Sequence, residues 1–195
     1  MKIIAYTAAY GSLVDANSRK STIGKTKKVL AGILCGLERT WMADGRNNPN
    51  HKKFWIVKPD GTETFHEQLA PVFRPAYLDL KPNPFQRTVC AMIPVTEEQI
   101  EALDKRESGY DRIDVTHLMM TWNKNVPVFT YISKAEGRIG IAHKEAAIPA
   151  PYLLLCRNAA IKFGHGMGEN FYNHITNCSD CQCIKPVTLG DNVTY

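Results

Sequence analysis

The clearest structural signal in the chain is the stretch TEEQIEALDKRESGY, residues 96–110. Thr96 is a typical helix N-cap, and Gln99, three residues later, completes a capping box. Two acidic residues between them suit the positive end of the helix dipole. The stretch therefore predicts a helix that begins after Thr96, runs to about Arg106 and stops at Gly109.

The end of this helix carries an acidic residue on its apolar side. Ile100, Leu103 and Glu107 are spaced at i, i+3 and i+7, so they share one helical face. Burial and the negative end of the helix dipole both raise the pKa of a carboxyl group at such a place. This favours Glu107 as a general acid or base. The alternative is that the helix ends at Arg106 and that Glu107 only caps it or pairs with a basic neighbour.

Short apolar segments on both sides of this helix predict strands. They lie at residues 2–10, 28–41, 54–57, 88–94, 112–118 and 126–133, the last two as partners. For 28–41, periodicity alone leaves a helix as the alternative. Four prolines in residues 66–87 leave room for short extended pieces only. Residues 18–28 are polar and basic, and we expect them to form a connector.

Two more helices are expected towards the C-terminus. The first spans residues 152–163, and Gly164 follows its end. The second, at residues 169–175, is expected to lie on the domain through Phe171, Tyr172 and Ile175. Strands interleaved with a few helices predict an α+β domain built around an antiparallel sheet or small barrel. We expect one domain over residues 1–195, with 165–195 as a C-terminal extension.

Composition and charge narrow the function classes. The chain has 195 residues, 44% apolar and 22% charged, which is typical of a folded globular protein. Its longest uncharged apolar stretch, residues 29–37, is too short to cross a bilayer, so no membrane partner is expected. The net charge of +5 permits an anionic partner. The basic stretch 19–28 has no interleaved aromatic residues, which favours a solvated loop over nucleic-acid binding.

The cysteines fall into two groups. Three lie in apolar runs, where a thiol behaves as a small hydrophobe, and three lie near the C-terminus after a histidine. The second group is His174, Cys178, Cys181 and Cys183. These residue types suit zinc, but Cys-x-Cys is cramped for one tetrahedral ion, so we expect reduced cysteines and no metal. The N-terminus is interpreted as a strand and not as a signal peptide, so we expect a cytoplasmic protein.

A glycine and a serine follow the first predicted strand, in Tyr10-Gly11-Ser12-Leu13. Glycine permits a sharp turn and lets a ligand approach the backbone closely. Successive N–H groups in such a turn can form a nest for a carboxylate. The alternative is an ordinary tight turn with a serine in it.

Several segments keep a distinctive order over residues 2 to about 164. They are Tyr10-Gly11-Ser12-Leu13, Ala76-Tyr77-Leu78-Asp79-Leu80, Leu103-Asp104-x-x-Glu107-x-x-Tyr110, Val115, Tyr131, and Pro151-Tyr152 at the start of a helix that ends at Gly164. This order resembles the gamma-glutamylcyclotransferase superfamily. The first and third motifs together are specific, whereas either alone would be weak.

The resemblance implies a small mixed β-barrel with helices packed outside and an open cavity at one end. It also implies a reaction in which the α-amine of a gamma-glutamyl group attacks its own side-chain carbonyl. The products are 5-oxoproline and an amine, amino acid or peptide, as in glutathione metabolism. The class is a lyase or acyltransferase that needs no cofactor, because the attack is intramolecular.

The resemblance also implies roles for particular residues. Glu107 takes a proton from the α-ammonium group and returns one to the leaving amine. The backbone amides of the first motif hold the substrate and stabilise oxyanion charge. Tyr131 donates a hydrogen bond to the substrate. The implied binding residues are Tyr10, Gly11, Ser12, Leu13 and Tyr131.

Two other functions stay open on the sequence alone. One is a binding protein that keeps the cavity and sequesters an anionic small molecule without turnover. The other is an interaction module for nucleic acid or protein that uses the basic stretch and the cysteine tail. The sequence does not define the leaving group or the oligomeric state.

Overall fold

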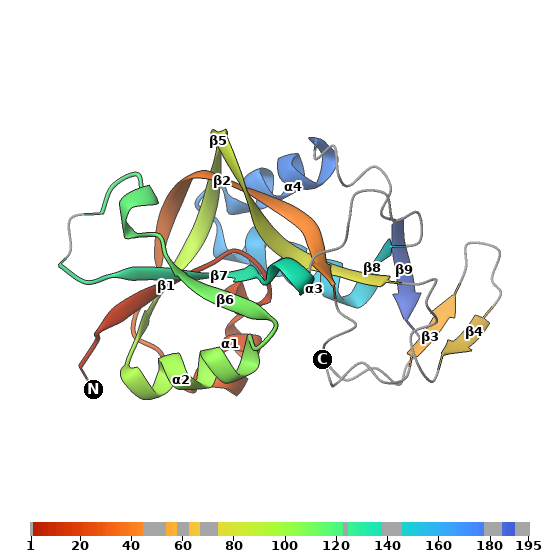
Figure 1. The fold of residues 1–195 in the computed structure, drawn as a ribbon, viewed down its shortest axis with the longest axis horizontal. Helices are drawn as coiled ribbons and strands as arrows, with labels where there is room; N and C mark the ends of the chain where they lie inside the picture. Colours follow the sequence, from red (N-terminus) through yellow and green to blue (C-terminus); the bar gives the residue numbers. More distant parts are fainter. Residues whose placement is uncertain are drawn as a thin grey trace.

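The chain folds into a bent, mixed sheet flanked by helices, which confirms the expected α+β class (Figure 1). The computed structural model describes residues 2–44, 54–57, 63–66, 74–122, 125–137, 146–177 and 185–189. Cys178, Cys181 and Cys183 lie outside these residues, so the expectation about metal is not tested here.

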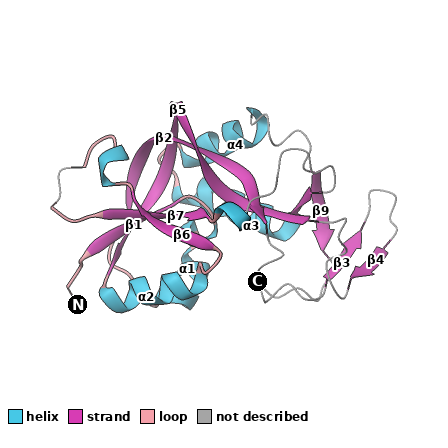
Figure 2. Ribbon diagram, viewed as in Figure 1, coloured by secondary structure: helices cyan, strands magenta, loops and turns pink. Residues whose placement is uncertain are grey.

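Five strands form the main part of the sheet. Their order is β2 (Leu30–Asp44), β5 (Arg74–Val95), β1 (Ala5–Ala9), β7 (Val128–Ser133) and β6 (Tyr110–Asp114). The pair β1–β7 is parallel and the other neighbours are antiparallel (Figure 2). The predicted strands at 2–10, 28–41, 88–94 and 126–133 are confirmed. The strand expected at 112–118 instead ends at Asp114, where the short η3 (Thr116–Leu118) begins.

Four shorter strands extend the sheet from the beginning of β5. They are β8 (Ala146–Pro149), β9 (Lys185–Leu189), β3 (Phe54–Val57) and β4 (Glu63–His66). β8 runs parallel to β5 and to β9, and β3 runs antiparallel to β9 and β4. Of these four, only β3 was predicted from the sequence.

The expected closed barrel is not confirmed. Within the described residues no ladder joins β2 to β6, so the sheet stays open. A single bridge between Leu34 and Met119 and a hydrogen bond from Met120 N–H to Ile33 O, 3.0 Å, connect β2 to the segment after β6. The sheet therefore curves around the core without closing.

The long ribbon of β2 and β5 bends sharply at its middle. Cys35 pairs with Arg87 but Leu37 pairs with Pro82, so β5 contains a bulge of four residues opposite Gly36 alone. Gly36 has φ +77°, which favours glycine. The expectation of short pieces only in residues 66–87 is wrong from Arg74 onward. Pro84 lies in this bulge, where a strand tolerates proline, and Pro82 is the paired residue beside it.

Helices cover the sheet on more than one side (Figure 1). They are α1 (Ala16–Ile23), α2 (Glu97–Arg106), α3 (Ala150–Phe163) and α4 (Met167–Asn177), with short turns at η1 (Ser12–Val14) and η4 (Ala135–Gly137). α2 has both hydrogen bonds of the predicted capping box. α1 corrects the expected connector at 18–28: the Asp15 side chain accepts from the N–H groups of Asn17 and Ser18 and caps a polar helix.

The C-terminal helix α4 packs on β2 and β5. Its buried residues are Met167 and Phe171, which are four positions apart and share one face. Tyr172 is 64% exposed, so its predicted place in the contact is wrong. Within the described residues no helix has the length and apolar character needed to span a membrane.

Candidate active site

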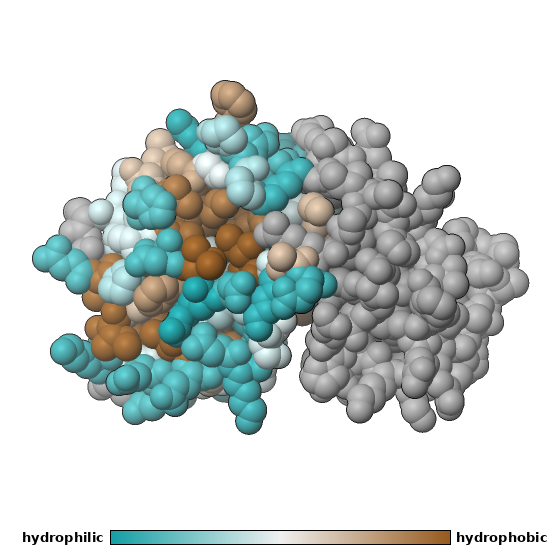
Figure 3. Space-filling model, in the orientation of Figure 1, coloured by the Kyte–Doolittle hydropathy of each residue, from teal (hydrophilic) through white to brown (hydrophobic). Residues whose placement is uncertain are grey.

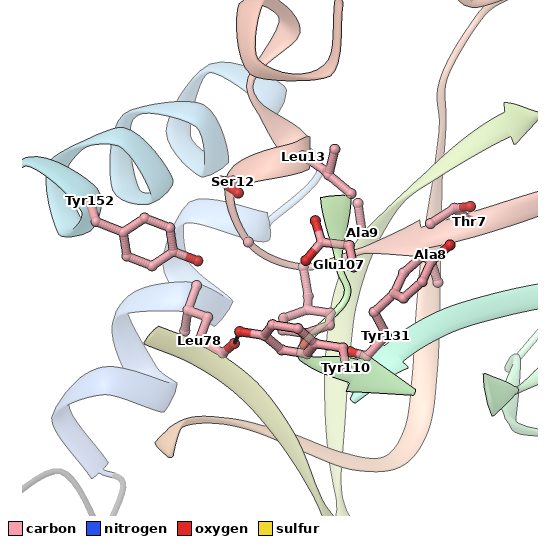
Figure 4. A pocket seen from close by; sticks show the side chains of 12 residues that line it. Thr7, Ala8, Ala9, Ser12, Leu13, Leu78, Glu107, Tyr110, Tyr131 and Tyr152 are labelled. Atoms are coloured by element: carbon pink, nitrogen blue, oxygen red, sulfur yellow. Dashed lines mark hydrogen bonds between the residues drawn. The ribbon is translucent and has the colours of Figure 1, made fainter. Parts of the chain in front are cut away.

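A small cavity opens where β1 ends, between η1, the end of α2, and α3 (Figure 4). It encloses about 40 Å³, room for a few water molecules or for a small part of a ligand. Its lining includes four tyrosines, several small or aliphatic residues and one acidic residue. The lining residues are Thr7, Ala8, Ala9, Tyr10, Gly11, Ser12, Leu13, Leu78, Glu107, Tyr110, Tyr131 and Tyr152.

The turn from Tyr10 to Leu13 forms one wall. The N–H groups of Val14 and Asp15 donate to the carbonyls of Gly11 and Ser12, at 3.0 and 3.1 Å. These bonds close a tight turn without using the N–H groups at its beginning, as at the start of any helix. A Cβ atom at Gly11 would lie 3.4 Å from the Tyr152 hydroxyl, so the backbone itself forms the surface of the cavity there.

Glu107 is the C-cap of α2, and its backbone is held on both sides. Its N–H donates to Leu103 O, and its carbonyl accepts from the Tyr110 N–H, both at 2.8 Å. The carboxyl group faces the cavity, and 18% of the side chain is exposed (Figure 4). Burial raises the pKa of this carboxyl group, and the neighbouring Arg106 guanidinium offsets part of the increase.

The structure confirms the simpler interpretation of Glu107, and the functional one stays a prediction. The helix ends at Arg106, and Glu107 Oε1 pairs with Arg106 Nε at 3.1 Å, as the simpler alternative expects. The same carboxyl group also lines the cavity with a raised pKa, as the functional interpretation expects. A capping residue and a candidate acid–base group are here one residue.

All four tyrosines in the lining have hydrogen-bonded hydroxyls, and three of these hydroxyls donate to an oxygen. The Tyr10 hydroxyl donates to Tyr131 O at 2.6 Å, and the Tyr110 hydroxyl donates to Leu78 O at 3.1 Å. The Tyr131 hydroxyl donates to Asp104 Oδ1 at 2.7 Å. Tyr131 thus lines the cavity with its ring, while its hydroxyl is engaged with α2.

The fourth tyrosine, Tyr152 at the start of α3, points its hydroxyl towards the same space as Glu107 (Figure 4). Burial raises the pKa of Tyr152 well above its usual range, and the hydrogen bond to Cys156 adds to this. Burial also raises the pKa of the Cys156 thiol to about 12. Both groups therefore stay neutral near pH 7, and Tyr152 is a hydrogen-bond donor.

The structure brings all six sequence-predicted site residues to one cavity: Tyr10, Gly11, Ser12, Leu13, Glu107 and Tyr131. Sequence reasoning named no role for Leu78, Tyr110 or Tyr152, although each lies in a segment that carries the family resemblance. It also missed Arg106, whose position beside Glu107 was the available signal. Among the described residues there is no group of three or more His, Cys, Asp or Glu side chains that could hold a metal ion.

Comparison with solved structures identifies the fold. A gamma-glutamyl cyclotransferase superimposes with a TM-score of 0.60 at 12% identity, over 86% of this chain and 85% of that one. The human protein loc79017, described as uncharacterized, gives 0.59 at 12% identity over 87% and 85%. YkqA from Bacillus subtilis gives 0.54 at 14% identity over 88% of this chain and 54% of that one.

The chain therefore has the gamma-glutamyl cyclotransferase fold, as its sequence resemblance predicts. At 12–14% identity these matches describe the fold and not the activity. No protein-family model matches the sequence, and no curated protein matches it significantly.

Proposed function

We propose that the protein is a gamma-glutamylcyclotransferase, which converts a gamma-glutamyl group to 5-oxoproline and releases an amine, amino acid or peptide. One observation carries the proposal. The partly buried Glu107 carboxyl group and the turn that ends β1 line the same cavity, within the fold of a known cyclotransferase.

The reaction needs one base and one acid in succession. Glu107, as a carboxylate, takes a proton from the α-ammonium group of the substrate, and the free amine attacks the γ-carbonyl carbon. A C–N bond forms, and the amide C–N bond to the leaving group breaks. Glu107 returns this proton to the leaving nitrogen. The attacking nitrogen loses a second proton as the lactam forms, and Glu107 passes it to the released amine, which leaves as an ammonium ion, so atoms and charge balance. A carboxyl group with a raised pKa suits both steps.

The remaining cavity residues orient the substrate. In this proposal the N–H groups at the start of the Tyr10–Leu13 turn bind a carboxylate or the developing oxyanion. The Tyr152 hydroxyl lies beside Gly11 of the same turn, and it would have to leave Cys156 to donate to the substrate (Figure 4). The proposed hydrogen bond from Tyr131 to substrate would require its hydroxyl to leave Asp104. The tyrosine rings bury the glutamyl group, and the leaving group extends outward because the cavity is small.

A substrate panel tests the proposal. Purified protein is incubated with glutathione, gamma-glutamyl amino acids and gamma-glutamyl amines, and 5-oxoproline is measured. We expect turnover of at least one class and its loss in Glu107→Gln. Glu101→Gln, which changes an exposed acid on the same helix, is the matched control and should remain active.

The outcomes separate the two main hypotheses. Turnover that needs Glu107 supports the cyclotransferase. Saturable binding of gamma-glutamyl compounds without any 5-oxoproline would instead identify a binding protein that uses the same cavity. A Glu107→Gln variant with more than half of the wild-type activity would remove Glu107 from the mechanism.

A further inference from the structure

Arg106, the last residue of α2, makes contacts that reach beyond its own helix. Its Nε pairs with Glu107 Oε1 at 3.1 Å. Its Nη2 donates to Ser12 Oγ and to Ser18 Oγ, each at 3.0 Å. Its Nη1 donates to Ser18 O at 3.1 Å and to Thr22 Oγ1. All three guanidinium nitrogens are therefore engaged, and one side chain joins α2, η1 and α1.

Two of these contacts are parts of the candidate site. Glu107 supplies the carboxyl group, and Ser12 lies in the turn that forms one wall of the cavity. Because both contact the same planar guanidinium, its rigidity fixes the carboxyl group relative to the turn. A lysine has one nitrogen on a flexible stem and would not make this set of contacts.

The ion pair with Arg106 affects the protonation state of Glu107 because the other groups around the carboxyl group are neutral or acidic. Other elements place neutral, hydroxyl-bearing rings around the carboxyl group. The groups electrostatically coupled to it are Tyr10 after β1, Tyr110 of β6, Tyr131 of β7 and Tyr152 of α3. Asp79 of β5, a buried acid, acts on Tyr10 and Tyr110 in the same region. Arg106 is the cation in direct contact.

We propose that Arg106 is a positioning residue, which holds the Glu107 carboxyl group as a base aimed into the cavity and ties it to the Tyr10–Leu13 turn. The inference rests on the proposed function of Glu107 and adds a residue to it. Without the guanidinium, the buried carboxyl group would bind its proton more tightly and would be less often a base at neutral pH. Its position relative to the turn would also be less well defined.

The test measures the protonation of Glu107 directly. In protein with ¹³C-labelled glutamate, the Glu107 carboxyl resonance is titrated in wild type, Arg106→Met and Arg106→Lys. We expect the Glu107 pKa to shift to higher values in Arg106→Met and less in Arg106→Lys. Lys105→Met, which removes an exposed positive charge next to Arg106, should leave the titration unchanged.

Kinetics supply the second readout. In Arg106→Met, kcat should fall roughly 10- to 100-fold at neutral pH, the scale of a small misplacement of a catalytic group. The acidic limb of the kcat/KM profile should move to higher pH together with the NMR titration. A folded Arg106→Met protein with an unchanged Glu107 pKa, or with a shifted pKa and undiminished kcat, would overturn the proposal.

Two provisions keep the test decisive. If Arg106→Met does not fold, the ¹⁵Nε resonance of Arg106 is followed in the wild type, where it must titrate with Glu107; a resonance that ignores that titration overturns the proposal. If no gamma-glutamyl substrate is turned over, the proposed function fails. The NMR titration then still decides whether Arg106 controls Glu107.

Discussion

Two arginines hold the same turn from two different parts of the fold, and they do so by different chemistry. Arg106, at the end of α2, contacts the side chains of Glu107 and Ser12 and is 26% exposed. Arg39, in the middle of β2, is 1% exposed. Its Nε donates to Tyr10 O at 3.0 Å, and its Nη2 donates to Val89 O.

Arg39 lies where β1 separates from β5. β1 pairs with β5 only as far as Ala9 and Ala91, and the bend of the β2–β5 ribbon brings Arg39 back to this point. Its Nη1 donates to Asn170 Oδ1 of α4 at 2.6 Å, and its guanidinium lies over the Phe171 ring at 5.7 Å. The C-terminal helix is thereby connected to the Tyr10 carbonyl.

The two arginines differ in how far their positive charge, beyond their hydrogen bonds, affects the groups they contact. The partners of Arg39 named here are neutral oxygens, so its hydrogen bonds matter most. Burial lowers the pKa of Arg39 to about 10, which still leaves it protonated at neutral pH. Arg106 contacts a group that titrates, so its charge matters as well. We therefore expect Arg106 variants to change activity and Arg39 variants to change stability.

The largest effect on activity should come from Glu107→Gln, tested alone and together with Arg106→Met. Glu107→Gln alone should lower kcat by about 100- to 10,000-fold, the usual loss of acid–base catalysis. Arg106→Met should cost little further activity in the Glu107→Gln background, because the carboxyl group it serves is gone. A double-mutant cycle on kcat measures this coupling. Additive losses of kcat would mean that Arg106 acts independently of Glu107.

Arg39→Met should give the largest loss of stability. It leaves the carbonyls of Tyr10 and Val89 and the Asn170 amide without their guanidinium donor. A buried group left unsatisfied costs about 1–3 kcal/mol, and the Tyr10 carbonyl is buried while the other two are partly buried. We expect the free energy of unfolding to fall by about 3 kcal/mol or more, measured by chemical denaturation. Arg157→Met on the exposed face of α3 is the control. Equal losses in both variants would mean that the buried contacts contribute nothing special.

Asn170→Ala should have a smaller effect of the same kind. Its carboxamide accepts from the Val89 N–H at 3.0 Å and donates to Arg87 O at 2.9 Å, besides its contact with Arg39. Loss of these bonds should cost about 1–3 kcal/mol, or roughly 2–10 °C in Tm. Differential scanning calorimetry checks this against the exposed Asn158→Ala. An unchanged Tm would mean that the contacts of Asn170 with β5 and Arg39 do not contribute to stability.

Gly11→Val tests the residue between the two points that the arginines hold. The Cβ atom alone would contact Leu78 and the Tyr152 hydroxyl, and the methyl groups add bulk beside the cavity. We expect substrate affinity to fall about tenfold, the effect of filling part of a binding pocket, with a smaller change in stability. Calorimetric titration and a melting curve on the same sample compare the two. Normal affinity in a protein with a much lower Tm would make Gly11 a structural residue only.

The smallest effect concerns pH and stability. Because folding raises the Glu107 pKa, the folded state favours the protonated carboxyl group. This contribution is complete below the unfolded value of about 4.3 and is lost as pH rises through the folded value. Glu107→Gln should therefore become more stable than wild type as pH rises. The loss in Arg39→Met should stay constant from about pH 5 to 8, because Arg39 does not titrate there.

Denaturation curves at several pH values measure both trends. A constant difference between Glu107→Gln and wild type would mean that burial does not raise the Glu107 pKa in solution. A pH-dependent difference for Arg39→Met would mean that a titrating group depends on it.

The sequence predicted elements that are stabilised by local interactions and missed elements that depend on residues far away in the chain. α2 was predicted with its cap and its end because Thr96, Gln99 and the apolar spacing lie within a few turns of one another. Glu107 followed from the same spacing. α1 was missed because it is polar, with Ile23 as its buried residue, so it has no apolar stripe to detect. Its stability comes from the Asp15 cap and from Arg106, far away in the sequence.

Arg39 shows the opposite case. Its partners Tyr10, Val89 and Asn170 lie 29, 50 and 131 residues away. No local pattern predicts such contacts, because they depend on the bend of the ribbon and on the packing of α4. The bend was not predicted, because the prolines in this part of the sequence favoured several short extended pieces over the single long strand β5.

The contacts of Asn170 also have a consequence for aggregation. Its carboxamide is chemically a peptide group, and it occupies one N–H and one carbonyl of β5 as a neighbouring strand would. Exposed strand edges invite pairing between molecules and aggregation, and proteins commonly cover them. Here one side chain on a helix ends the ladder beyond β1, so the protection of this edge against self-association depends on the C-terminal region.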